Sequence, residues 1–192
     1  MYLNGDYSKL YFLAGDHDIT VSDDTPYPVI YKINSVIKHA SYVPTSDKQD
    51  YDIALAKTNE QIRYKKTIGP ACLPYVFMNA NTYFDGQSLM VPGWGAEEFA
   101  GPSPNKLKKT SLKVEKTCAT PSQMCTSTTG SDACTRDSGG SLYWTAGGRQ
   151  YTVGIVSFGV ACAANVPATN TRVTSYISWI ESKATGAFFC RK

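Results

Sequence analysis

Asp132-Ala-Cys-Thr-Arg-Asp-Ser138-Gly-Gly140 is a polar, glycine-flanked turn between two strand-like segments of this 192-residue sequence. Ser138 stands between Asp137 and two glycines, which let the backbone turn sharply and leave no side chain in front of the hydroxyl. Consecutive N–H groups in such a turn can hold a developing negative charge. The pattern therefore predicts a serine nucleophile or, more simply, a loop beside a structural disulfide at Cys134. A serine nucleophile also needs a base and a group that orients the base.

Four other stretches accompany this turn in a fixed order along the chain. They are Asp52-Ile-Ala-Leu55, Pro92-Gly-Trp-Gly95, Val153-Gly-Ile-Val-Ser-Phe-Gly159 and the segment from Thr171 to Ile180. Together with the turn around Ser138, they resemble the motifs of the chymotrypsin/trypsin family of serine proteases, over nearly the whole chain. The resemblance implies an all-β fold, a trypsin-like double β-barrel with a C-terminal helix.

Aromatic and β-branched residues between turn signals predict strands over 9–14, 28–38, 52–57, 87–92, 106–115, 141–144, 151–158 and 169–173. Set against the family fold, residues 1–62 correspond to a remnant of the N-terminal barrel with about half of its strands. Residues 63–86 correspond to the inter-barrel connection and 87–173 to a complete C-terminal barrel. A helix is expected over 174–184, followed by a tail over 185–192. Half a barrel would expose strand edges and one side of a core.

The overall composition and charge give little reason to expect certain classes of binding partner. A net charge of +3 at pH 7 gives no reason to expect a nucleic acid or an anionic membrane surface. No apolar run approaches the roughly 18 residues that span a membrane, and the first residues lack the features of a signal peptide. We expect no cofactor and no metal, and we expect the run Lys106-Leu-Lys-Lys109 to be a solvated strand face.

The six cysteines, at positions 72, 118, 125, 134, 162 and 190, indicate an oxidising compartment, although six cysteines allow 15 pairings. The resemblance implies the pairs Cys118–Cys125 and Cys134–Cys162. Relatives use the position of Cys72 for a bridge to a propeptide, and Cys190 has no usual counterpart. These two cysteines are therefore expected to pair with each other or with a segment outside the chain. A secreted type of cysteine pattern without a secretion signal predicts an incomplete chain of an extracellular protein.

The resemblance assigns Ser138 as the nucleophile and Asp52 as the carboxylate that orients the base and stabilises its charged form. The base itself is missing, because the family's histidine precedes the region where this chain begins. The sequence holds two histidines, His17 in a surface-loop pattern and His39 at a strand end. Neither occupies the position of the base, so Ser138 is expected to stay a protonated hydroxyl near neutral pH.

The oxyanion hole would consist of the backbone N–H groups of Arg136 and Ser138. Most relatives have glycine in place of Arg136, and a non-glycine residue costs about 1 kcal/mol if that backbone needs a positive φ. In relatives, the residue at the position of Asp137 pairs with an amino terminus created by zymogen cleavage. No matching segment exists in this chain, so the loop is expected to be zymogen-like or rearranged.

The substrate-binding residues implied by the resemblance surround a pocket for one substrate side chain. Asp132 matches the base of a trypsin-type pocket, where a carboxylate selects Arg or Lys. Ser157, Phe158 and Gly159 match the wall along which the substrate backbone pairs as an added strand. Ala168 stands where relatives often have glycine, and its methyl group would narrow the pocket.

These residues predict the domain of a trypsin-like serine endopeptidase that acts on polypeptides after Arg or Lys. The 192-residue polypeptide itself is expected to be inactive. The alternative is a non-catalytic serine protease homologue, a secreted binding or regulatory module. A third alternative is a polypeptide with no stable fold.

Overall fold

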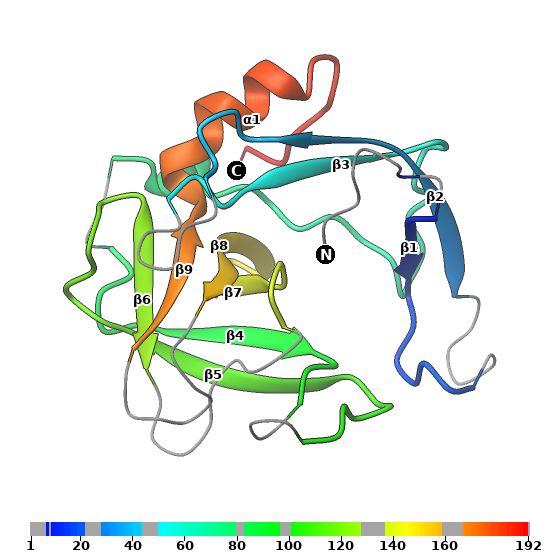
Figure 1. Cartoon of the computed structure of the whole chain (residues 1–192), viewed down its shortest axis with the longest axis horizontal. Coiled ribbons are helices and arrows are strands. Elements are labelled where there is room, and N and C mark those ends of the chain that lie inside the picture. Colours follow the sequence, from blue (N-terminus) through cyan, green and yellow to red (C-terminus); the bar gives the residue numbers. More distant parts are fainter. Residues whose placement is uncertain are drawn as a thin grey trace.

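The computed structural model describes residues 7, 9–21, 28–43, 50–79, 83–96, 101–127, 137–158 and 167–191. Two β units lie side by side, a three-stranded antiparallel sheet and a closed barrel (Figure 1). The sheet has the order β1-β2-β3, with β1 (Tyr11–Ala14), β2 (Val29–Lys38) and β3 (Ala54–Thr58). The barrel closes in the order β4-β5-β6-β9-β8-β7, with strands β4 (Ser88–Gly93), β5 (Lys108–Val114), β6 (Gln123–Ser127), β7 (Ser141–Ala146), β8 (Arg149–Phe158) and β9 (Ala168–Arg172). The described residues therefore confirm an all-β fold of the trypsin-like type.

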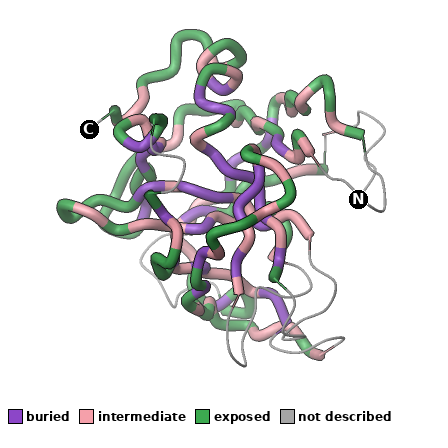
Figure 2. The backbone as a smooth tube through the Cα atoms, turned by 90° about the vertical axis from the view of Figure 1, so that its left-hand side faces the viewer, coloured by how far each residue is buried: buried purple, intermediate pink, exposed green. Residues whose placement is uncertain are grey.

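Apolar residues at every second position of β4 and β5 fill part of the barrel interior. Leu89 and Val91 on β4 pair in register with Leu112 and Thr110 on β5. Leu89 and Leu112 are fully buried, whereas their sequence neighbours face outward. Because side chains alternate across a strand, one apolar residue in two is enough to fill the interior. Figure 2 shows the result, with buried residues along the central strands and exposed ones at the turns.

The three-stranded sheet is covered much less completely than the barrel. Its small core contains Ala14, Tyr31 and Ile68. On β1, Tyr11, Phe12 and Leu13 are 59%, 44% and 41% exposed, and on β2, Ile30 is 67% exposed. Among the described strands, β1 and β3 each pair on one side only, with β2. The described part of this sheet thus leaves several apolar side chains of β1 and β2 exposed.

The C-terminal segment packs against the sheet rather than extending the barrel. A 3-10 turn, η2 (Val173–Tyr176), leads into α1 (Ile177–Lys183), which lies over one end of β3 in Figure 1. Ile177 and Ile180 on α1 share a core cluster with Ile53, directly before β3. The predicted helix is therefore present, but its first turn is 3-10. None of the helices in the described ranges is long and apolar enough to cross a bilayer.

Two disulfides connect described segments. Cys118–Cys125 forms as the resemblance implies, and Cys72 is bonded to Cys190 across 118 positions of sequence. Of the two alternatives for Cys72, the internal pair is the one found, so its sulfur is not available for a bridge to a propeptide. In the chain-entropy view, closing so long a loop stabilises the fold by about 4–5 kcal/mol. The expected pair Cys134–Cys162 lies outside the described residues.

The segment between β3 and β4 and the C-terminal tail are also in contact near the Cys72–Cys190 disulfide. A 3-10 turn, η1 (Tyr75–Phe77), follows Cys72, and the Tyr75 hydroxyl donates a 3.0 Å hydrogen bond to Glu181 on α1. Arg191 forms a 2.7 Å ion pair with the same carboxylate. The tail therefore folds back onto the connection.

One strand of the barrel was not predicted. The strand β6 was not recognised because its residues Gln-Met-Cys-Thr-Ser are mostly polar and adjoin a short disulfide loop. In the structure, Met124 and Thr126 of β6 are fully buried, and the strand pairs with both β5 and β9. The prediction was wrong here because pairing in the closed barrel outweighs a weak local preference for strand.

The first prediction concerns the core of the barrel. Replacing Leu112 by alanine removes a fully buried side chain and leaves a cavity, which should lower the free energy of unfolding by about 2–5 kcal/mol. Urea unfolding followed by tryptophan fluorescence measures the change. Ser111→Ala is the matched control, because Ser111 is exposed on the same strand, and it should alter stability little. Equal effects of the two substitutions would contradict the burial described for β5.

Candidate active site

Ser138 lies on an exposed turn that β8 holds in place through its backbone. The Gly139 N–H donates a 2.8 Å hydrogen bond to the Val156 carbonyl, and the Val156 N–H donates one of 2.8 Å to the Gly140 carbonyl. Gly139 has a φ of +86°, a conformation that favours glycine. The two glycines that follow Ser138 in the sequence therefore allow the turn and its attachment to the barrel.

Ser157, one residue further along β8, contacts both Ser138 and Asp52. The Ser138 hydroxyl makes a long 3.5 Å contact with the Ser157 carbonyl. The Ser157 hydroxyl donates a 2.6 Å hydrogen bond to Oδ2 of Asp52, and Thr171 on β9 donates one of 2.7 Å to the Asp52 carbonyl. In the described chain, the other carboxylate oxygen of Asp52 accepts no hydrogen bond. Asp52 is therefore oriented by two barrel strands and retains a free acceptor.

The backbone just before Asp52 is in an unusual conformation. Tyr51 has a φ of +62°, which costs a non-glycine residue about 1–2 kcal/mol. The Tyr51 N–H donates a 3.1 Å hydrogen bond to the Tyr176 hydroxyl, directly before α1. Burial raises the pKa of Tyr176 above its usual value, which keeps this hydroxyl neutral. The C-terminal segment thus helps to position Asp52.

Neither histidine is placed to act as a base for Ser138. His39 stacks on Tyr51 at 4.7 Å between ring centroids and lies 5.1 Å from the Trp179 ring. Its Nδ1 accepts a 3.2 Å hydrogen bond from the Ser41 N–H. His17 is exposed, and its backbone N–H donates a 2.7 Å hydrogen bond to Asp16. In the described chain, neither imidazole forms a hydrogen bond with Ser138 or Asp52.

The carboxylate of Asp137 lies against the Pro92-Gly-Trp-Gly95 motif. Its Oδ1 accepts a 2.9 Å hydrogen bond from the Gly95 N–H. A Cβ atom on Gly93 or Gly95 would overlap this carboxylate, so a larger residue at either position would displace the Asp137 side chain from where it lies. The position of this carboxylate gives a physical reason for the two glycines of the Pro92–Gly95 motif, which was identified in the sequence only by its resemblance to the family.

The structure places the other predicted site residues on the rim of the barrel, as far as they are described. Phe158 is half-buried at the end of β8 and pairs across strands with Thr169, next to the buried Ala168. Three predicted site residues lie outside the described residues: Asp132, Arg136 and Gly159. The structure thus brings together Asp52, Ser138 and Ser157.

Several positioning contacts were not predicted from the sequence. They come from Thr171, Tyr176 and the Gly95 N–H, each more than 40 residues from its partner. Ser157 was assigned only to the substrate wall, not to the orientation of Asp52. No local pattern in the sequence could have indicated these pairs.

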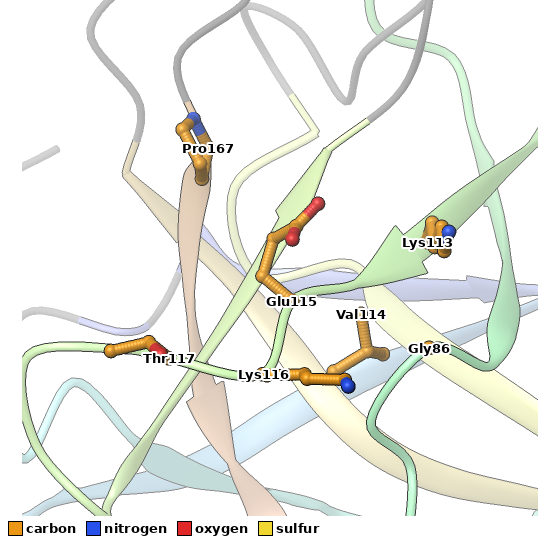
Figure 3. A pocket seen from close by; sticks show the side chains of 7 residues that line it. All are labelled: Gly86, Lys113, Val114, Glu115, Lys116, Thr117 and Pro167. Carbon is orange, nitrogen blue, oxygen red and sulfur yellow. The ribbon is translucent and has the colours of Figure 1, made fainter.

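A groove of about 370 Å³ opens elsewhere on the barrel, between the end of β5 and the start of β9 (Figure 3). Its lining residues are Gly86, Lys113, Val114, Glu115, Lys116, Thr117 and Pro167. None of them belongs to the group around Ser138. Among the described residues, no three His, Cys, Asp or Glu side chains are grouped to hold a metal ion.

Comparisons with known proteins agree with this geometry. The sequence model of the family described as Trypsin matches residues 4–180. A venom serine protease of Polistes dominula is 32% identical over an alignment covering 99% of this chain and 71% of the relative. Venom serine protease 34 of Apis mellifera is 36% identical, with 95% and 47% covered, and chymotrypsin-2 of Vespa crabro is 32% identical, with 94% and 88% covered. The turn that carries Ser138, the nearby Asp52 carboxylate and this match over most of the sequence together place the chain in the trypsin family of serine proteases.

Proposed function

We propose that the chain carries the nucleophile and the orienting carboxylate of an extracellular serine endopeptidase that cleaves after Arg or Lys. We further propose that the 192-residue polypeptide does not hydrolyse peptides by itself. The observation that supports both statements is the meeting of Ser138 and Asp52 at Ser157 with no imidazole between them.

The chemistry follows from what each group can do in this arrangement. The exposed Ser138 hydroxyl would attack a substrate carbonyl if a base took its proton as the bond to carbon formed. The Asp52 oxygen that accepts no hydrogen bond could accept the N–H of an imidazole and stabilise its charged form. The backbone N–H groups of Arg136 and Ser138 would hold the oxyanion. Without the imidazole, the serine proton has no acceptor and the first step does not start.

Selection of Arg or Lys depends on Asp132 in this proposal. A carboxylate at the base of a narrow pocket binds a guanidinium or an ammonium group and leaves other side chains unpaired. Ser157 and Phe158, with Gly159, would pair with the substrate backbone, and the Ala168 methyl would limit the width of the pocket. Extracellular localisation is supported by the two internal disulfides and by venom proteases among the relatives.

The second candidate is a non-catalytic homologue that binds a polypeptide without cleaving it. It is favoured by the placement of His39, whose ring is engaged by aromatic neighbours rather than by Asp52. Sequencing the transcript upstream of the Met1 codon distinguishes the two. A histidine followed by cysteine in the translated segment supports the enzyme, and another residue in place of that histidine supports the homologue.

Reaction with an active-site probe tests the lack of a base. We expect the purified chain to remain unlabelled by a fluorophosphonate and not to hydrolyse an arginine ester, because the Ser138 hydroxyl is not activated. Intact-mass spectrometry measures labelling, with a complete trypsin-family protease as the positive control and Ser138→Ala as the negative control. Stoichiometric labelling of Ser138 would overturn the proposal.

Ligand binding tests the proposed specificity without requiring hydrolysis. Benzamidine carries an amidinium group that should pair with Asp132, so Asp132→Asn should weaken its binding about tenfold or more. Isothermal titration calorimetry measures the dissociation constant, and Asp85→Asn serves as a control that also removes one carboxylate. An unchanged dissociation constant in Asp132→Asn would exclude Asp132 as the selective group.

A further inference from the structure

One short segment of this chain carries a larger net positive charge than the chain as a whole. Residues 106–116 contain five lysines and one glutamate, which is four net positive charges. The whole chain carries a net charge of +3, so the rest of it is slightly negative. All five lysines are exposed. A concentration of this kind creates a local field that the net charge of the protein conceals.

Strand geometry places part of this charge on one face. Lys109, Ser111 and Lys113 alternate with the inward-facing Leu112 and Val114 along β5. Lys109 and Lys113 therefore both project from the outer face of the barrel, about 14 Å apart along the strand. β5 pairs with β4 from Lys108 to Lys113 and with β6 at Lys113 and Val114, so no strand can be added beside Lys113.

The neighbouring strands do not neutralise these lysines. The cross-strand partner of Lys109 is Pro92, and those of Lys113 are Ser88 and Ser127. None of these residues is acidic. In the described chain, neither Lys109 nor Lys113 forms an ion pair. Their ammonium groups are therefore available to a ligand.

The groove described above extends this face beyond the end of β5. Lys113 and Lys116 both line it. The one acidic residue there, Glu115, accepts a hydrogen bond from the Ser127 hydroxyl, and its carboxylate points away from the Lys116 ammonium group in Figure 3. Lys109, Lys113 and Lys116 form what we call the basic strip.

We propose that the basic strip binds a linear sulfated polysaccharide, at a surface separate from the group around Ser138. Lysine offers a compact point charge, whereas recognition of a phosphorylated side chain favours the planar fork of arginine, and the strip contains no arginine. Where β5 is paired with both β4 and β6, at Lys113, an acidic peptide cannot bind by strand addition. A chain of closely spaced sulfates matches side-chain charges spread along one strand and into a groove.

Binding of size-defined heparin fragments to the purified 192-residue chain tests this proposal. The triple variant Lys109→Gln/Lys113→Gln/Lys116→Gln should bind about tenfold more weakly or worse in 0.1 M salt, measured by calorimetry. If three charges are involved, raising the salt from 50 to 200 mM should weaken wild-type binding roughly 20- to 40-fold. The matched control removes three exposed lysines elsewhere, Lys32→Gln/Lys57→Gln/Lys66→Gln, and should retain wild-type affinity.

Three results would overturn the proposal. The first is wild-type affinity for heparin no greater than for uncharged dextran. The second is an equal loss of affinity in the two triple variants, which would mean attraction to net charge alone. The third is tighter binding of polyglutamate than of heparin, which would make an acidic polypeptide the occupant. Circular dichroism spectra matching that of the wild type show that the variants are folded.

Discussion

The hydrogen bond between the Ser157 hydroxyl and Asp52 is the interaction on which the arrangement of the site depends. Asp52 lies two residues before β3 of the three-stranded sheet and Ser157 lies on β8 of the barrel, 105 positions apart in the sequence. The carbonyl of the same Ser157 faces the hydroxyl of Ser138. One residue of β8 therefore contacts both Ser138 and Asp52, so a shift of the sheet against the barrel would change the position of Asp52 relative to Ser138.

Several contacts keep the sheet and the barrel together. Tyr176 holds the strained backbone at Tyr51, and α1 buries Ile177 and Ile180 beside Ile53. The Cys72–Cys190 disulfide fixes the tail that follows α1 to the connection between the two units. These contacts all involve the C-terminal segment. This segment covers one end of the small sheet and so helps to position Asp52, which lies just before β3.

Much of the fold could be predicted from the sequence, because the strands carry apolar residues at alternate positions and the motifs of the family stand in order. Strand β6 could not, since Met124 and Thr126 are buried through pairing with β5 and β9 rather than through local preference. The sequence predicted Ser138 and Asp52 as site residues, and the structure brings both into contact with Ser157, whereas neither histidine forms a hydrogen bond with them in the described chain. The role of Ser157 toward Asp52 could not be predicted, because long-range hydrogen bonds leave no periodic trace in a sequence.

The central claim is that no imidazole of this chain lies between Ser138 and Asp52. Nuclear magnetic resonance of a sample with 15N-labelled histidine tests it directly, by following the ring nitrogens of His17 and His39 in the wild type, in Ser138→Ala and in Asp52→Asn. The account predicts that no ring nitrogen signal responds to both substitutions. A ring nitrogen that shifts in response to both substitutions would contradict it.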